Sequence, residues 1–121
     1  MLRGAEHRYE FVNPLYEELF PDRELLGRTV VEAVPEAVEQ GFIGLLDRVY
    51  QTGEPYLGRE VLFQLHRRDT GQVEDVFVNV TFQALREHGA TVGISVFAFE
   101  VTELVRARQK LEQLLNDATM T

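Results

Sequence analysis

The sequence predicts an α+β domain in which short helices flank one face of an antiparallel sheet and a C-terminal amphipathic helix follows. Three observations indicate this fold class. Short helical segments, broken by Pro and Gly, fill the first half of the chain. Between residues 56 and 100 the apolar residues alternate with a period of two, as in an antiparallel meander. From Val101 onward their spacing is helical again.

Composition and charge indicate one folded domain and limit the kinds of partner that it can bind. The chain has 121 residues, of which 45% are apolar and 26% charged, as expected for one folded domain. Its formal net charge of −8 argues against nucleic acid or an anionic membrane as a partner. No apolar run reaches the roughly 18 residues of a membrane span, and Met1–Gly4 lacks a signal-peptide core. We therefore expect a cytoplasmic protein.

The opening segment combines a short strand with a short helix. Tyr9–Asn13 is rich in β-forming residues and is predicted to be a strand. Asn13 can cap a helix N-terminus, and Pro14 loses no hydrogen bond at the first helical position. We expect a helix over Leu15–Phe20, stopped by Pro21.

Two further helices are expected before the sheet. Gly27 can adopt the left-handed backbone conformation that ends a helical turn. Thr29 and Glu32 then form a capping-box pattern, which indicates the start of a short helix. From Gly41 to Gln51 the apolar residues recur on one helical face, and Gly53 is the expected C-cap.

The meander has two distinct faces. The residues expected to face the helices are Val61, Phe63, Leu65, Val76, Val78, Val80, Phe82, Val92, Ile94, Val96 and Ala98. The opposite face carries Phe77, Phe97 and Phe99, although the outer face of a sheet flanked on one side is usually polar. We therefore expect another surface to cover this face.

The final helix carries a heptad seam. Leu104, Ala107, Leu111, Leu114 and Ala118 are spaced three, four, three and four, as in helices that pair. Two heptads are too short to be stable alone, so the segment is either the start of a longer coiled coil or a helix lying on the sheet. The expected division is a domain over residues 1–103 and a C-terminal linker helix over residues 104–121.

This succession of elements resembles the PAS sensory domain, also called the sensory box. Three motifs carry the likeness: Tyr9–Pro14 at the opening, Leu25–Arg28 in the position of the family's "ELLGR" turn, and Glu100–Thr102 in the position of its Asp-Ile-Thr element. The chain is most similar to cytoplasmic PAS domains upstream of bacterial and archaeal sensor histidine kinases. It departs from the family in having only Met1–Gly4 for the first strand, and in having Glu100 in place of the commoner Asp.

The resemblance implies a sensory and dimerisation module of a two-component system. A change in the core or at the interface would reach a downstream effector of the same chain, a histidine kinase, through the C-terminal helix. The family's acidic-x-Thr element implies signal coupling by Glu100 and Thr102, with Arg28 as a basic partner; alternatively, Thr102 simply caps the helix. The residues expected in a homodimer contact are Phe97, Phe99, Leu104, Ala107, Leu111 and Leu114.

The sequence shows no catalytic machinery, so we expect a protein that is not an enzyme. The absence of Cys excludes thiolate ligands and a Cys nucleophile, and with them the cysteinyl photochemistry of related LOV and photoactive-yellow domains. His7, His66 and His88 are expected on the surface, and none lies where haem-binding relatives place an axial His. No metal site or cofactor motif is recognisable; a small apolar ligand is the only candidate.

Such a ligand would lie between the helix that starts near Gly41 and the inner face of the sheet. The candidate lining residues are Phe42, Leu46, Val49, Val61, Phe63, Val78, Val80, Ile94 and Val96. This lining is either an apolar pocket or a filled core, and a filled core would make the domain a ligand-free dimeric spacer. A small cone-shaped enzyme of the ketosteroid-isomerase type is the other alternative, and it requires a carboxylate inside the cone.

Overall fold

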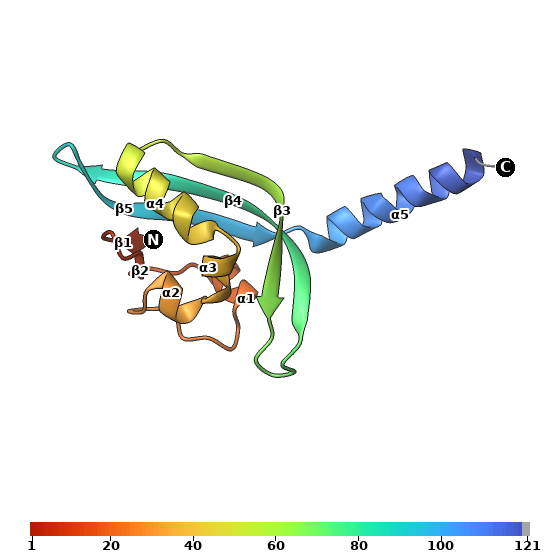
Figure 1. The fold of residues 1–121 in the computed structure, drawn as a ribbon, viewed down its shortest axis with the longest axis horizontal. Helices are drawn as coiled ribbons and strands as arrows, with labels where there is room; N and C mark the ends of the chain where they lie inside the picture. The colour runs from red at the N-terminus through yellow and green to blue at the C-terminus, as the bar shows by residue number, and fades with distance from the viewer. Residues whose placement is uncertain (120–121) are drawn as a thin grey trace.

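The computed structural model describes residues 1–119 and contains a five-stranded antiparallel sheet of order β2-β1-β5-β4-β3. Figure 1 shows the short helices packed together beside this sheet and the last helix leaving it. The expected α+β class is confirmed. In chain order the elements are β1 (Leu2–Arg3), β2 (Arg8–Tyr9), α1 (Pro14–Leu19), α2 (Val30–Ala33), α3 (Glu36–Glu39), α4 (Phe42–Thr52), β3 (Tyr56–His66), β4 (Val73–Glu87), β5 (Ala90–Glu100) and α5 (Thr102–Thr119).

The two N-terminal strands are the shortest elements. β1 lies inside the sheet, where Leu2 pairs with Tyr9 on one side and with Ile94 on the other. The expected strand over Tyr9–Asn13 is wrong in extent, because β2 ends at Tyr9. The Tyr9 N–H donates to the Arg28 carbonyl, and the Tyr9 carbonyl accepts from the Gly27 N–H. These bonds hold the end of β2 against the loop before α2, and the chain then turns toward α1.

The helix boundaries follow the predicted caps. The Asn13 side chain accepts a hydrogen bond from the Tyr16 N–H at 2.9 Å and starts α1. Thr29 and Glu32 form the complete capping box at the start of α2. Gly53 ends α4 in the left-handed conformation, with φ of 77°. The short helix α3 was not predicted.

The meander has the predicted faces. β4 pairs antiparallel with β3 and β5 along most of its length, so that Val80 lies between Gly58 and Ala98. The inner residues of β4 are buried beneath α4 and share the core with residues of α1 and α3, while Asn79 and Thr81 alternate to the outer face. β3 is interrupted between Gly58 and Val61 by a β-bulge. There Glu60 adopts a left-handed backbone conformation, with φ of 50°.

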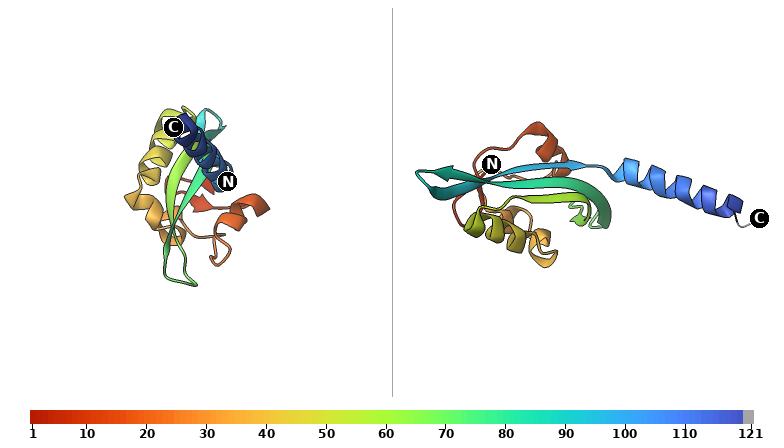
Figure 2. Two further views of the ribbon diagram at one scale, coloured as in Figure 1. Left: turned by 90° about the vertical axis from the view of Figure 1, so that its right-hand side faces the viewer. Right: turned by 90° about the horizontal axis from the view of Figure 1, so that it is seen from above.

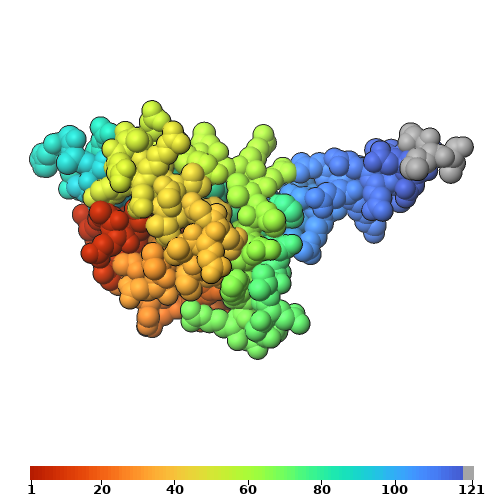
Figure 3. All heavy atoms as spheres, viewed as in Figure 1, coloured from red at the N-terminus to blue at the C-terminus, as the bar shows by residue number. Residues whose placement is uncertain are grey.

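Helix α5 leaves the domain at the end of β5. The right-hand view in Figure 2 shows it projecting beyond the sheet, and Figure 3 shows it as an arm that extends from the body of the molecule. Val105, which is 3% exposed, packs at its base, whereas Leu111 and Leu114 are exposed. No helix within residues 1–119 combines the length and apolar character that a membrane crossing requires.

Candidate functional site

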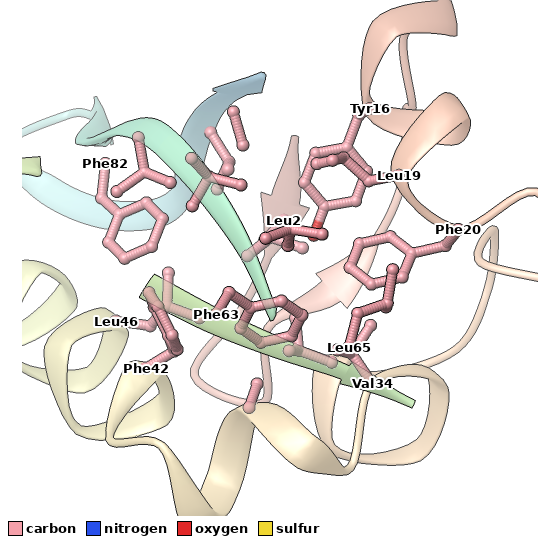
Figure 4. A pocket seen from close by; sticks show the side chains of 17 residues that line it. Leu2, Tyr16, Leu19, Phe20, Val34, Phe42, Leu46, Phe63, Leu65 and Phe82 are labelled. Atoms are coloured by element: carbon pink, nitrogen blue, oxygen red, sulfur yellow. The ribbon is translucent and has the colours of Figure 1, made fainter. Parts of the chain in front are cut away.

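An apolar cavity of about 70 Å³ lies between the helices and the inner face of the sheet. Figure 4 shows side chains from α1, α4 and the strands converging on it. Its lining consists of Leu2, Tyr16, Leu19, Phe20, Val30, Val34, Ala37, Phe42, Leu46, Phe63, Leu65, Val76, Val78, Val80, Phe82, Val96 and Ala98.

Six of the nine candidate residues line this cavity: Phe42, Leu46, Phe63, Val78, Val80 and Val96. Val49 and Ile94 are buried in the adjoining core, and Val61 packs against it from the bulged part of β3. The part of the cavity wall that α1 to α3 form was not predicted. One available signal was that Leu19 and Phe20 follow Tyr16 by three and four residues, which places them on one face of the helix.

The volume limits what the cavity can hold. An apolar cavity of roughly 150 Å³ can bind benzene, and this one is about half that size. Phe63 lines it and makes edge-to-face contacts with Phe20 at 6.2 Å and with Phe42 at 5.5 Å between ring centroids. A ligand larger than a few heavy atoms would require these rings to move.

Tyr16 supplies the only polar side chain of the lining. Its hydroxyl lies 2.6 Å from that of Tyr9. Burial raises the pKa of Tyr16 to about 12 and, together with the neighbouring Tyr16, raises the pKa of Tyr9 well above its usual range. Both phenols are therefore neutral at physiological pH. Because one donates to the other, one hydroxyl hydrogen is left to serve a further acceptor.

The junction between the sheet and α5 is built on Phe77. Its N–H donates to the Thr102 hydroxyl at 2.9 Å, and its carbonyl accepts from the Val101 N–H at 2.7 Å. Thr102 is 4% exposed. Thr102 is the first residue of α5 and not the residue before it, and its hydroxyl accepts from β4, so this side chain fastens the helix to the sheet instead of capping it. The base of α5 is thereby fastened to the strand that lines the cavity.

A family model described as the PAS fold matches residues 2–106. The chain belongs to the PAS family. Membership supports a sensory or signalling module, in agreement with the resemblance carried by the three short motifs. The matched region covers the whole sheet and reaches the second turn of α5, which includes the Phe77–Thr102 junction.

The expected partnership of Arg28 with Glu100 is absent from this PAS domain. Arg28 donates to Glu24 at 3.1 Å, beside the loop that pairs with β2. Glu100 is exposed at the end of β5. Arg67 forms its ion pair with Glu74, and the pKa of Arg67 is raised by this hydrogen bond and further by the nearby charges of Glu74 and Glu100.

A buried ion pair closes one end of the PAS core and was not predicted. Arg23 donates to both carboxylate oxygens of Glu36 at 2.6 Å, and these side chains are 5% and 1% exposed. Arg23 also donates to the carbonyls of Ala33 and His66, and the His66 N–H donates to Glu36. The pair thus ties the loop after α1 to α3 and to the end of β3. Burial alone would raise the pKa of Glu36, but these hydrogen bonds hold it below its usual value.

The expectation for His7 is wrong, whereas His66 and His88 are exposed as expected. His7 is 3% exposed, and its Nε2 lies 2.7 Å from Asp47 Oδ1 of α4. The turn between β1 and β2 carries the ring under α4, where it meets Tyr50 edge to face. His7 therefore packs the N-terminal strands against α4. Within residues 1–119 no group of three or more His, Asp or Glu side chains suits a metal ion.

The residues expected at a homodimer contact are all exposed: Phe97, Phe99, Leu104, Ala107, Leu111 and Leu114. On the outer face of the sheet Phe97 pairs with Thr81, and Phe99 pairs with Asn79. Helix α5, which carries the predicted seam, begins directly after β5. Leu115, outside the predicted seam, is exposed as well.

Proposed function

We propose that this PAS domain is a sensory and dimerisation module that relays a change in its core or at its interface to a downstream effector through α5. The observation that carries the proposal is the Phe77–Thr102 hydrogen bond, because it fastens the output helix to a strand of the cavity wall. The similarity to PAS domains of sensor histidine kinases makes a histidine kinase in the same chain the proposed effector.

The relay depends on the neighbouring positions of two residues of β4. Val78 lines the cavity, and the backbone of Phe77, one residue earlier, holds the first turn of α5. A ligand or an interface contact that displaces β4 by a fraction of an ångström would move the base of the helix. The population of α5 orientations would then shift, and the effector would respond to that shift.

The proposed dimer uses two exposed apolar surfaces. Phe97 and Phe99 are 56% and 47% exposed on the outer sheet face, and Leu104 and Leu111 are 62% and 58% exposed on α5. Exposed apolar surface of this kind favours association. Packing α5 against the same helix of a second copy would bury its seam.

Light scattering coupled to size exclusion tests the dimer directly. We expect the mass of two chains at high micromolar concentration, and a lower average mass for Leu111→Glu, which places a charge in the seam. Arg106→Glu, a charge change outside the seam on the same helix, is the matched control. A strict monomer at millimolar concentration would contradict the proposed dimerisation.

A second candidate is a ligand-free dimeric spacer, and the small volume of the cavity favours it. Native mass spectrometry, with thermal-shift screening of small apolar molecules, separates it from a ligand sensor. We also propose that the domain is not an enzyme. The cavity lining contains no carboxylate, and the pKa of the buried Glu36 is lowered, whereas the ketosteroid-isomerase type of site needs an enclosed carboxylate with a raised pKa.

A further inference from the structure

We propose that Arg108 of α5 switches between two acidic partners: Glu60 of its own sheet and Glu103 of a second copy of the chain. This inference rests on the proposed dimerisation through α5. It goes beyond dimerisation because it assigns a role to Arg108: the ion pair of Arg108 with Glu60 of the same chain opposes the association of two chains. The switch would connect the β3 bulge, next to the core, with the dimer interface.

The pair within one chain is present in the structure. Arg108 binds both carboxylate oxygens of Glu60, with 3.1 Å between Nη1 and Oε2 and a shorter contact from Nη2. The hydrogen bond from Arg108 lowers the pKa of Glu60. The two side chains are 46% and 29% exposed, so the pair can open without leaving a buried charge. The residues are 48 positions apart and link the arm to the sheet.

The backbone around Glu60 determines where its carboxylate lies. The residue sits in the bulge between Gly58 and Val61, with φ of 50°. Its N–H donates to the Asn79 side chain at 2.8 Å, which holds the bulge against β4. The following residue, Val61, packs against the core. A displacement of this part of β3 therefore moves the acidic group that holds Arg108.

The heptad register supplies the second partner. With Leu104 and Leu111 at a and Ala107 at d, Arg108 occupies an e position and Glu103 the preceding g position. In a parallel coiled coil, a g residue lies beside the e residue that follows it by five positions in the partner helix. Glu103 of one copy would then meet Arg108 of the other.

The next heptad offers no equivalent pair. Lys110 at g would lie beside Leu115 at e, so Glu103 with Arg108 is the only complementary g–e pair within residues 102–119. Nη1 and Nη2 of Arg108 are both bound to Glu60, so a bidentate pair of the same two nitrogens with Glu103 of the second copy requires the Glu60 pair to open. The two pairings therefore compete. Opening the Glu60 pair favours the dimer, and forming the dimer frees the bulge.

Single substitutions give opposite expected effects on dimer affinity, measured by analytical ultracentrifugation. Glu60→Gln removes the competing partner and should lower the dimer dissociation constant about threefold, the scale of an exposed ion pair. Glu103→Gln removes the partner across the interface and should raise the constant by a similar factor. Glu39→Gln, an exposed residue of α3, removes the same charge away from α5 and should change nothing. Both effects should shrink as ionic strength rises.

Two charge exchanges separate the pairs. Glu60→Arg with Arg108→Glu rebuilds the ion pair within the chain. Glu103 of the second copy would then lie beside an acidic residue at position 108, so the dimer should be weaker. Glu103→Arg with Arg108→Glu rebuilds the pair between chains but sets Glu60 against an acidic residue, and should strengthen the dimer. Circular dichroism and thermal melting would verify that both variants fold.

The outcomes distinguish this inference from the function on which it rests. A dimer whose affinity is unchanged or reduced by Glu60→Gln overturns the switch and leaves dimerisation in place. Equal affinities of the two exchanged variants overturn it as well. A wild-type chain that stays monomeric at millimolar concentration overturns both proposals. Opposite shifts for the two single substitutions, with the two exchanges differing as stated, support the switch.

Discussion

The N–H of Phe77 in β4 donates to the hydroxyl of Thr102 in α5 at 2.9 Å, which joins a strand of the cavity wall to the output helix. Thr102 is buried, and the Val101 N–H donates to the Phe77 carbonyl beside it. These two bonds extend the ladder between β4 and β5 by one step, into the first residue of the helix. The base of α5 therefore moves with β4.

Replacing the Thr102 hydroxyl should loosen this junction. Thr102→Val keeps the shape of the side chain but leaves the Phe77 N–H without its acceptor, which costs about 1 kcal/mol of the free energy of unfolding. Hydrogen exchange of the Phe77 amide should become faster. Thr102→Ser keeps the acceptor and is the matched control. Equal exchange rates in the two variants would show that the hydroxyl does not hold the strand.

The pair of Arg23 and Glu36 should contribute strongly to stability. Arg23→Met leaves the Glu36 carboxylate buried without its cation, and breaking a buried pair from one side destabilises by about 3–5 kcal/mol. Urea unfolding at pH 7 measures this loss. Arg28→Met breaks an exposed pair with Glu24 and serves as the control, with little expected change. A similar small effect for both substitutions would contradict the assigned role of Arg23.

Acid should remove the contribution of Glu36. The pKa of this carboxyl is lower in the folded chain than its ordinary value of 4.5, so its stabilisation is complete above that pH and is lost as the pH falls through the folded pKa. The difference in unfolding free energy between the wild-type chain and Glu36→Gln should therefore shrink between pH 6 and pH 3. Glu24→Gln, at an exposed position, should not reproduce this trend. A constant difference for Glu36→Gln would contradict the lowered pKa.

The patterned elements could be predicted from the sequence, because each residue of a long strand or helix repeats the same environment. Val76, Val78 and Val80 all face the core, as the period of two requires. β1 and β2 contain two residues each, which is too few to show a period. The predicted strand over Tyr9–Asn13 is therefore longer than the observed one.

The polar contacts of the site could not be predicted, because they join residues that are distant in the chain. Arg23 and Glu36 are 13 residues apart, and Glu60 and Arg108 are 48 apart; neither pair has a local signal. His7 lies in a turn, where an exposed side chain is the ordinary expectation, and only the packing of α4 over that turn buries it. The heptad seam could be recognised, but not which side of α5 meets the sheet.

Filling the cavity should distinguish a ligand site from a packing defect. Ala98 lines the cavity from β5, whereas Ala84 packs against the core from β4 without lining it. Valine at either position increases the tendency to form a strand, so the comparison of Ala98→Val with Ala84→Val isolates the effect of filling. If the cavity is empty, Ala98→Val should raise the melting temperature above that of Ala84→Val by a few degrees, on the order expected for about 1 kcal/mol.

A bound ligand would reverse that result. The chain purified from cells would carry a small molecule detectable by native mass spectrometry, and Ala98→Val would lose it and melt below Ala84→Val, because ligand binding stabilises the folded state. We expect the first outcome, since the 70 Å³ cavity has room for the two added methyl groups but only for a very small ligand. Loss of a bound molecule together with a lower melting temperature in Ala98→Val would instead establish the cavity as a sensor site.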